Sequence, residues 1–541
     1  MYFVNVPCDR DIPFLVNRSF YSRSPHFVEG DLLFPRESTK THNYRTIFGW
    51  AFAHKGVIYR NTNRNLGLAI RRLTGVRLTK SMKLGLTPVS YDYDDGLREN
   101  QKKYFETLEV RNMLDQIREI YTPHFVEYLG AEEEAHNHYD DPHAKRELRI
   151  QAMDELRASG DYYTKCWTVR KPKSVLKKNE WAKHSKLPRA IVDLGVPSSL
   201  AGFRTTEYFK KAMATEPIYY KGGMIDFCKA PTFEKLKYVF AELIRPTHRF
   251  YFVYFSDDSC VAINVGGRIL RANLDISSCD ASHTRHLFRA LHHITPDIAK
   301  PDVDNLIAQC EAKLSVQSTG GMYKATYGFT EPRLYSGSTL TTTINNLANI
   351  AIALSIANLE HITPETIVGA AAKVGYIITF DECQDWHQLQ FLKNSPVRDS
   401  RDGAIVPALN VGVVLRLSGT CKGDLPGRGD IKRRAADFQA SLLQGAIPRV
   451  HTPFTDLLKS RVGGEAKYDV SSYFEYKTIH QEDIYVTTKE YFRRYEIPEY
   501  DLDYLFSLTA EAGFGTLTHC RASDMILQKD YELGYLDEYT K

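Results

Sequence analysis

The chain has 541 residues, 43% of them hydrophobic and 25% charged, which is the composition of a globular protein and excludes a disordered or fibrous chain. A chain of this length exceeds one ordinary hydrophobic core, so several domains or subdomains are expected. Its 70 Lys and Arg nearly balance its 66 Asp and Glu, so a nucleic-acid-binding surface would have to come from local clusters of basic residues.

Cysteine spacing and hydropathy indicate in which compartment the protein works and whether it spans a membrane. The 9 Cys include no Cys-x-x-Cys pair, which favours reduced thiols in a cytosol-like compartment. The N-terminus lacks the charged and apolar segments of a signal peptide. The longest nearly apolar run, residues 347–359, is too short to span a membrane and predicts a core helix. No Gly-x4-Gly-Lys-Ser/Thr motif is present, so no P-loop nucleotidase is expected.

The N-terminal third mixes strand-like and helical patterns. A basic stretch between His54 and Arg72 is interpreted as a solvated face, with a phosphate-binding surface as the alternative. Residues 98–160 have the spacing of helices, interrupted by a His/Asp-rich segment at residues 135–143. Because the potential ligands of that segment lack helical spacing, we expect a loop there and not a metal site.

The densest group of cationic residues follows at residues 165–189. Lys and Arg far outnumber Asp and Glu in this strip, and Trp167 and Trp181 lie among them. It runs into Lys186-Leu-Pro-Arg189-Ala-Ile-Val, a basic strand entering a core. Such a strand could neutralise a triphosphate and the backbone of a nucleic-acid template. A solvated basic loop is the other interpretation.

Two tight turns divide residues 250–275 into three apolar runs, which predicts a three-stranded antiparallel meander. The first turn carries Asp257 and Asp258, and the second is Gly266-Gly267. The two legs on either side of the glycines each have about eight residues, so at roughly 3.3 Å per residue they match in length. Asp275 is therefore predicted to lie level with Asp257 and Asp258, one strand away.

Three carboxylates gathered at one end of a buried sheet repel one another, and burial further disfavours their charged forms. A hard divalent cation removes this repulsion, and oxygen ligands from carboxylates and phosphates suit Mg²⁺. Two such ions about 4 Å apart can stabilise the attacking and the leaving oxygen of a phosphoryl displacement. The pattern therefore indicates a metal-dependent phosphoryl-transfer site, although a solvated acidic turn would explain these residues equally well when they are taken alone.

Polar residues continue after the meander. Asp280 follows Asp275, and a helical pattern runs from Thr284 to His293. After a long insert, Ser336-Gly-Ser-Thr-Leu-Thr341 forms a Gly-containing turn that opens a further helix, on which Thr341 and Asn345 share one face. The turn leaves backbone N–H groups free, and these can bind phosphate.

These elements resemble motifs of viral RNA-dependent RNA polymerases. Asp-x4-Asp at residues 275–280 resembles motif A, and Ser-Gly-x3-Thr-x3-Asn at residues 336–345 resembles motif B, each with matching internal spacing. Residues 374–380 and Phe391-Leu392-Lys393 are similar to motifs D and E, the latter a hairpin that grips the primer strand. Lys186-Leu-Pro-Arg189-Ala-Ile resembles motif F, whose basic residues cover the incoming triphosphate.

Motif C departs from the usual order. In most such enzymes a Gly-Asp-Asp hairpin follows motif B, whereas here the Ser256-Asp257-Asp258 hairpin precedes motif A. The order C, A, B resembles the permuted palm of permutotetravirus and birnavirus polymerases. A metal responds to where carboxylates lie in space and not to their order along the chain. The competing assignment places motif C at Phe380-Asp381-Glu382-Cys383, but the polar segment 384–388 that follows is a poor return strand.

The resemblance implies a role for each matching residue. Asp257 and Asp275, assisted by Asp258, would bind Mg²⁺ or Mn²⁺ and carry catalysis. Asp280 and Asn345 would recognise the ribose 2′-hydroxyl, which distinguishes ribonucleotides from deoxyribonucleotides.

The remaining matches concern the substrate. Ser336, Gly337 and Thr341 would position template and nucleotide, while Lys186 and Arg189 would hold the triphosphate. Residues 375–387 contain no lysine at the place where a motif D lysine would protonate pyrophosphate, which leaves His387 as a candidate.

The implied fold is α+β, a right-hand polymerase with fingers, palm and thumb and an antiparallel palm sheet of permuted connectivity. Residues 1–240 would form an N-terminal extension and the fingers, and residues 241–395 the palm, with a fingers insert at about 294–335. Residues 396–541 would form the thumb. The implied partners are RNA template and product, NTPs, and viral or host replication proteins around a monomeric core, in the host cytoplasm or the virion.

Two other functions stay open. Another palm-fold nucleotidyl transferase, such as a cyclase, has no need of the basic strip or of the Ser-Gly helix. A non-catalytic RNA-binding replication protein has no need of an intact set of three aspartates. The Tyr-rich stretch 468–539 is interpreted as packing, with a regulatory role at the cavity as the alternative.

Overall fold

A computed structural model gives the structure of the chain. It describes residues 2–4, 21–23, 51–59, 63–74, 76–77, 90–91, 95–128, 154, 172–178, 180, 182–183, 186–195, 202–215, 217–317, 324–328, 332–417, 430–446, 449–468, 482–512 and 517–535. Helices and strands are both present and the largest sheet is mainly antiparallel, in agreement with the α+β prediction. The His/Asp-rich segment 135–143 and the tryptophans of the basic strip lie outside the described residues.

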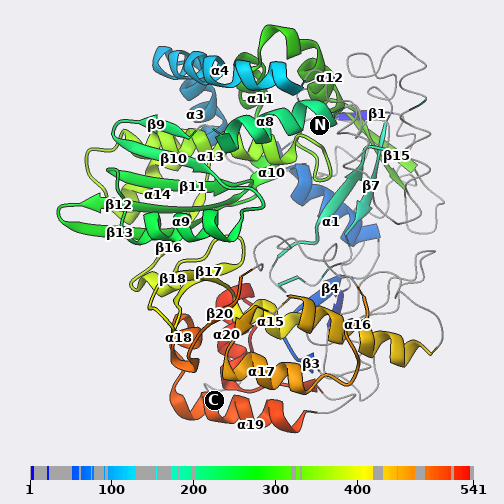
Figure 1. Ribbon diagram of the computed structural model, residues 1–541. Helices are drawn as coiled ribbons and strands as arrows, with labels where there is room; N and C mark the ends of the chain where they lie inside the picture. The colour runs from blue at the N-terminus through cyan, green and yellow to red at the C-terminus, as the bar shows by residue number, and fades with distance from the viewer. Residues whose placement is uncertain are drawn as a thin grey trace.

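A six-stranded sheet, called the central sheet below, lies between a group of helices and the C-terminal layer in Figure 1 and has the strand order β16-β13-β12-β11-β10-β9. The predicted meander is confirmed as three antiparallel strands, β11 (Phe250–Phe255), β12 (Asp258–Val265) and β13 (Arg268–Ile276). Their hairpin turns are Ser256-Asp257 and Gly266-Gly267. Ser256 and both glycines have positive φ angles, which tight hairpin turns require.

The outer strands extend this sheet on both sides. β16 (Ile378–Glu382) pairs antiparallel with β13, and β9 (Ile218–Tyr220) pairs antiparallel with β10 (Gly223–Phe227). β10 and β11 are parallel, because helix α9 (Phe233–Ile244) forms the crossover between them. The sheet is thus mainly antiparallel, with one parallel pair that the sequence did not predict.

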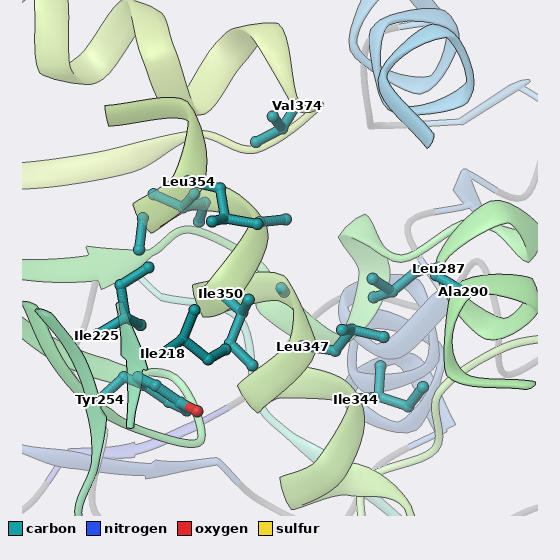
Figure 2. Close-up of a cluster of buried hydrophobic side chains, with 14 of the residues drawn as sticks. Ile218, Ile225, Tyr254, Leu287, Ala290, Ile344, Leu347, Ile350, Leu354 and Val374 are labelled. Atoms are coloured by element: carbon teal, nitrogen blue, oxygen red, sulfur yellow. The ribbon is translucent and has the colours of Figure 1, made fainter. Parts of the chain in front are cut away.

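Helices cover both faces of the sheet. The face with Val261 and Ile263 packs against α11 (Arg285–Ile294), α13 (Thr341–Ala357) and α14 (Pro364–Lys373), while α9 packs on part of the other face. Figure 2 shows the first of these cores, with Ile344, Leu347, Ile350 and Leu354 of α13 among the side chains of α11 and the sheet. α13 includes most of the apolar run 347–359 and is buried on nearly all sides. The predicted core helix is therefore confirmed.

The N-terminal and insert segments join in a five-stranded sheet beside the central one, in the order β1-β15-β14-β7-β8. Its strands are β1 (Tyr2–Val4), β15 (Lys324–Gly328), β14 (Leu314–Gln317), β7 (Lys173–Lys177) and β8 (Ala190–Asp193). The N-terminal half also contributes α1 (Asn63–Thr74), which packs against β7 and β8. Its helices α3 (Asp95–Glu106), α4 (Leu108–Tyr128) and α8 (Phe203–Thr215) instead join the core between the six-stranded sheet and α13, and the insert adds α12 (Lys300–Cys310).

The C-terminal layer begins with the hairpin β17 (Asn394–Arg398) and β18 (Ile405–Leu409) and then becomes helical (Figure 1). Its helices are α15 (Val411–Leu417), α16 (Ile431–Ala446), α17 (Pro453–Ser460), α18 (Thr488–Phe492), α19 (Glu499–Glu511) and α20 (Arg521–Tyr531). β3 (Ala51–Phe52) pairs with β21 (Leu517–Thr518), so a short N-terminal segment belongs to this layer. Among the described helices, none combines the length and the hydropathy needed to cross a membrane.

Candidate active site

Three of the predicted carboxylates meet where the β11–β12 turn lies beside the end of β13. Asp258 is directly opposite Asp275 in the antiparallel register, which places their Cβ atoms roughly 5 Å apart on one face of the sheet. Asp257 is the neighbouring turn residue, between Ser256 and the start of β12. The alignment that the strand lengths predict is therefore the one observed, and the roles of these residues stay predictions.

The three carboxylates make an unfavourable electrostatic group. Desolvation raises the pKa of Asp258 to about 7, and the charges of Asp257 and Asp275 contribute to this rise. Desolvation, followed by the charge of Asp257, raises the pKa of Asp275 to about 6, and desolvation also raises the pKa of Asp257. Asp257 and Asp275 nevertheless remain accessible to solvent. They are open to an entering ligand while protein surrounds them on the other sides.

The chemistry of this donor set fits a hard divalent cation. Within the described parts of the chain, no three His, Cys, Asp or Glu side chains form a ready-made metal site. Mg²⁺, however, is usually bound by one or two carboxylates together with water and substrate phosphates, so a closed cage is not required. The group at Asp257, Asp258 and Asp275 supplies only oxygen atoms and gains from any positive charge placed among them.

Helix α13 holds the turn that carries Asp257. The backbone N–H of Ser256 donates to Oδ1 of Asn346 at 2.7 Å, and the carbonyl of Ser256 accepts a hydrogen bond from Nδ2 of Asn349. Nδ2 of Asn345 donates to the Ser256 hydroxyl at 3.2 Å. Each of the three asparagines is at most 2% exposed. Since Ser256 has a φ of +56°, which non-glycine residues rarely adopt, these contacts stabilise a strained turn.

A second group of predicted residues meets beside this turn. Asp280, on the short helix α10 (Cys279–Ser282), accepts hydrogen bonds from the Ser336 hydroxyl and from Asn345. Burial raises the pKa of Asp280, and these two hydrogen bonds oppose the rise. Asp280, Ser336 and Asn345 therefore form one hydrogen-bonded corner, and Asn345 joins it to the Ser256 turn.

The loop before α13 is fixed against strand β8. The carbonyl of Ser336 accepts from the Val192 N–H at 2.9 Å. Gly337 has a φ of +100°, and a Cβ at this position would lie 2.6 Å from the Val192 carbonyl oxygen. Oγ1 of Thr341 donates to the Tyr335 carbonyl at 3.1 Å and so closes the loop. Only glycine fits at residue 337, because the backbone of β8 passes directly beside it.

The described part of the basic strip reaches the same region. Lys186 and Arg189 are exposed just before β8, and their charges lower the pKa of Asp275 and of Asp257 respectively. Nζ of Lys183 lies 3.0 Å and Nζ of Lys186 4.0 Å from the carboxylate of Glu532, which follows α20. Arg189 pairs with Glu180. Of the two residues predicted to hold a triphosphate, Lys186 thus lies beside a carboxylate of the C-terminal segment and Arg189 is paired with Glu180.

The predicted hairpin at Phe391-Leu392-Lys393 lies on the other side of Asp258. Phe391 pairs with Asn394, and both intervening residues have positive φ angles, as in a tight two-residue turn. The Leu392 N–H donates to Oδ2 of Asp258 at 3.1 Å. Lys393 is close enough to lower the pKa of Asp258, and its ammonium lies 4.5 Å from the centre of the Tyr531 ring.

Two alternatives raised by the sequence fit the structure poorly. Asp381 lies within edge strand β16 opposite Asn273, two residues short of the level of Asp275, and not on a turn. His387 is 2% exposed, and its Nδ1 and Nε2 lie 2.7 Å from Asp385 and 2.5 Å from Glu490. With both ring nitrogens bound to carboxylates, His387 is not placed to protonate pyrophosphate.

Several residues of the site were not predicted from the sequence. Asn346 and Asn349 hold the Ser256 turn, His283 contacts Asn345, and Glu532 contacts the lysines. The two asparagines carried a detectable signal, because uncharged polar residues stand out in an otherwise apolar helix and must find hydrogen-bond partners there. Glu532 carried none, since more than three hundred residues separate it from Lys183.

Comparisons with known proteins add a distant structural likeness. No family model and no curated protein matches the sequence. The chain is similar to the RNA polymerase VP1 from Infectious Pancreatic Necrosis Virus, with 12% identity and a TM-score of 0.39 over 56% of this chain and 46% of that one. A birnavirus VP1–VP3 complex is similar at 11% identity and a TM-score of 0.38, with the same coverage. The matched region thus spans less than half the length of either solved chain.

Proposed function

We propose that this protein is an RNA-dependent RNA polymerase that joins NTPs on an RNA template and replicates a viral RNA genome. The observation that carries this proposal is the register of Asp258 with Asp275 beside the turn of Asp257. A second group, Asp280, Ser336 and Asn345, lies next to it and offers the polar atoms that a ribose requires. Nucleotidyl transfer requires carboxylates that bind metal ions and polar groups that bind a sugar. Here the two groups lie next to each other.

Asp257 and Asp275, with Asp258 assisting, would hold two Mg²⁺ or Mn²⁺ ions, whose positive charge would favour ionisation of the attacking 3′-hydroxyl and of the pyrophosphate leaving group. The raised pKa values of Asp258 and Asp275 support this, because carboxylates that repel one another bind a cation strongly. Leu392 orients Asp258 through its backbone N–H. The chain itself thus contributes mainly position and charge, on which phosphoryl transfer depends.

The substrate would be held from two directions. Lys186 and Arg189 would neutralise the triphosphate, and Lys183 lies close enough to assist them. Ser336, Gly337 and Thr341, in the loop fixed against β8, would position the template and the nucleotide base. A 2′-hydroxyl could replace the hydrogen bond between Asn345 and Asp280, donating to Asp280 and accepting from Asn345, which would favour ribonucleotides.

The proposed palm is permuted. The hairpin of Asp257 and Asp258 precedes the strand of Asp275, and the two are adjacent antiparallel neighbours in the sheet. Only the Gly266-Gly267 turn separates β12 from β13, so the permuted order needs no long connection. Viral or host replication proteins are the proposed partners, in the host cytoplasm or in the virion.

The proposal is tested by incorporation of labelled NMP on a defined RNA template with Mg²⁺ or Mn²⁺. We expect the wild type to extend RNA with the complementary nucleotide, and Asp257→Asn and Asp275→Asn to lose nearly all activity. Asp381→Asn is the matched control, since Asp381 is also an acid on the same sheet, and it should retain activity. Template-independent product would favour a cyclase-like transferase, and RNA binding without any product would favour a non-catalytic protein.

A further inference from the structure

Asn345 connects the corner formed with Asp280 and Ser336 to the turn of Ser256 and Asp257. The orientation of its amide decides whether Oδ1 or Nδ2 faces these neighbours. Nδ2 donates to the Ser256 hydroxyl at 3.2 Å, and the side chain also hydrogen-bonds Asp280. The reversed amide would turn Oδ1 toward the Asp280 carboxylate, so that two acceptors would face each other. The site therefore requires a contact that keeps Oδ1 on the far side.

His283 makes the shorter of two such contacts, since the weakly donating Cys279 thiol also lies 3.2 Å from Oδ1. His283 is 0% exposed at the end of α10, with Nε2 2.8 Å from Oδ1 of Asn345 and Nδ1 3.0 Å from the hydroxyl of Tyr376. Burial lowers the pKa of His283 to about 4, so near pH 7 the ring is neutral and carries one N–H. Because Oδ1 can only accept, that hydrogen belongs on Nε2, and Nδ1 accepts from the Tyr376 hydroxyl.

The ring of His283 has little freedom to leave this position. Oε1 of Gln101 accepts from the Thr284 N–H at 2.9 Å, and Nε2 of Gln101 donates to the Ser282 carbonyl at 3.2 Å, so the backbone on both sides is held. The Tyr376 ring packs edge-on against the imidazole, with ring centres 5.7 Å apart. The orientation of Asn345 is therefore imposed from within the core and not by solvent.

We propose that His283 is a positioning residue that sets the selection of ribonucleotides over 2′-deoxyribonucleotides by fixing the amide of Asn345. This inference rests on the proposed function. With Nδ2 held toward Asp280, an incoming 2′-hydroxyl can replace the hydrogen bond between these two residues, donating to Asp280 and accepting from Asn345. A 2′-deoxynucleotide can make neither of these hydrogen bonds and so lacks the binding free energy that they contribute.

The test is the ratio of kcat/KM for ATP to that for 2′-deoxyATP on one template. His283→Phe keeps an aromatic ring beside Tyr376 but removes the N–H, and we expect the ratio to fall roughly tenfold or more. His283→Gln can still present an N–H to Asn345 and should restore part of the ratio. An equal loss of activity with both nucleotides would show that His283 only supports the fold, and it would overturn the inference.

Two further measurements keep the inference separate from the proposed function. If His283→Phe does not fold, Tyr376→Phe serves as the test variant. It removes the donor to Nδ1 and leaves His283 in place, so it should lower the ratio, but by a smaller factor than the loss of the imidazole would. If the wild type incorporates neither nucleotide, the proposed function fails, and equilibrium binding of ATP and 2′-deoxyATP with Ca²⁺ decides instead. A preference for ATP that His283→Phe abolishes supports the inference, and an absent or unchanged preference contradicts it.

Discussion

Asp258 and Asp275 have pKa values of about 7 and about 6, well above the usual value near 4 for an aspartate. Both shifts are upward, so the folded protein retains protons that the unfolded chain has already lost between about pH 4 and pH 7. The stability that these groups contribute is therefore complete at low pH. It is lost progressively as the pH rises from about 4 to about 7, because over this range the unfolded chain binds fewer protons than the folded protein.

The pH dependence of unfolding tests this electrostatic group. Without divalent ions, the melting temperature of the wild type should fall between pH 5 and pH 8 by more than that of Asp258→Asn, because the amide cannot ionise. Mg²⁺ or Mn²⁺ should raise the melting temperature more at pH 8 than at pH 5, since only ionised carboxylates bind the cation. Scanning calorimetry at each pH measures these melting temperatures. Parallel pH profiles for the wild type and Asp258→Asn would contradict the prediction.

The hydrogen bond from Ser256 to Asn346 offers a second test at the same scale. Asn346→Ala should lower the free energy of unfolding by about 1–3 kcal/mol, because it leaves the Ser256 N–H without its partner. Thr342→Ala, on the same helix but only half-buried, is the matched control and should have a small effect. Urea denaturation of the two variants decides the matter, and equal losses would show that the asparagine does not support the turn.

Single residues also show which contacts can be predicted from the sequence and which cannot. The level of Asp275 could be predicted because strands have a constant rise, so counting residues on both sides of Gly266-Gly267 was sufficient. The contacts of Asn346 and His283 could not, because they join residues 62 to 93 positions apart along the chain. A polar residue in an apolar segment indicates that a partner exists, but it does not identify that partner.

At the scale of elements, the loop before α13 depends on a close approach to β8. Gly337→Ala should lower the free energy of unfolding by about 1–3 kcal/mol and reduce incorporation, because the new methyl group meets the Val192 carbonyl at a positive φ. Gly369→Ala, within α14 and with nothing near its Cβ position, should instead stabilise the protein by about 0.5–1 kcal/mol. Denaturation curves of both variants check this contrast, and a neutral Gly337→Ala would contradict the packing described.

Elements defined by local signals were predicted well. The meander, the helix after Thr284 and the helix after Thr341 each carry turn residues or caps that act over a few positions. The parallel pairing of β10 with β11 was not predicted, because nothing within β10 (Gly223–Phe227) specifies which strand lies beside it. Pairing across a helical crossover is decided by packing of the whole layer.

Over the whole molecule, the chain returns from its C-terminal layer to the candidate active site. Glu532 follows α20, and the adjacent backbone is tied down by the Lys55 N–H, which donates to the Leu533 carbonyl at 2.7 Å. The carboxylate of Glu532 thereby reaches Lys183 and Lys186, the lysines proposed for the triphosphate. A nucleotide would have to displace this carboxylate or share the lysines with it.

Replacing Glu532 tests that competition. Glu532→Gln should lower the KM for NTP by about two- to fivefold, the range expected for loss of a partly exposed ion pair, with little change in kcat. The effect should shrink at high salt, because salt screens charges that solvent reaches. Glu511→Gln, an exposed acid at the end of α19, serves as the control. An unchanged or higher KM in steady-state incorporation assays would contradict competition for these lysines.

The arrangement of the layers was predictable only in part. The α+β class and the central meander follow from patterns along the chain, whereas the pairing of β3 with β21 joins residues near opposite ends of it. Such pairings carry a large loop-closure cost and form only when the rest of the molecule holds both strands in place. They can be found in the structure but not in either segment alone.

The most direct measurement is the anomalous diffraction of Mn²⁺ in crystals of the protein with RNA and a non-hydrolysable NTP. Two peaks about 4 Å apart, both contacted by carboxylate oxygens of Asp257 and Asp275, are the predicted result. Peaks at Asp381 instead, or none near the β11–β12 turn, would contradict the account.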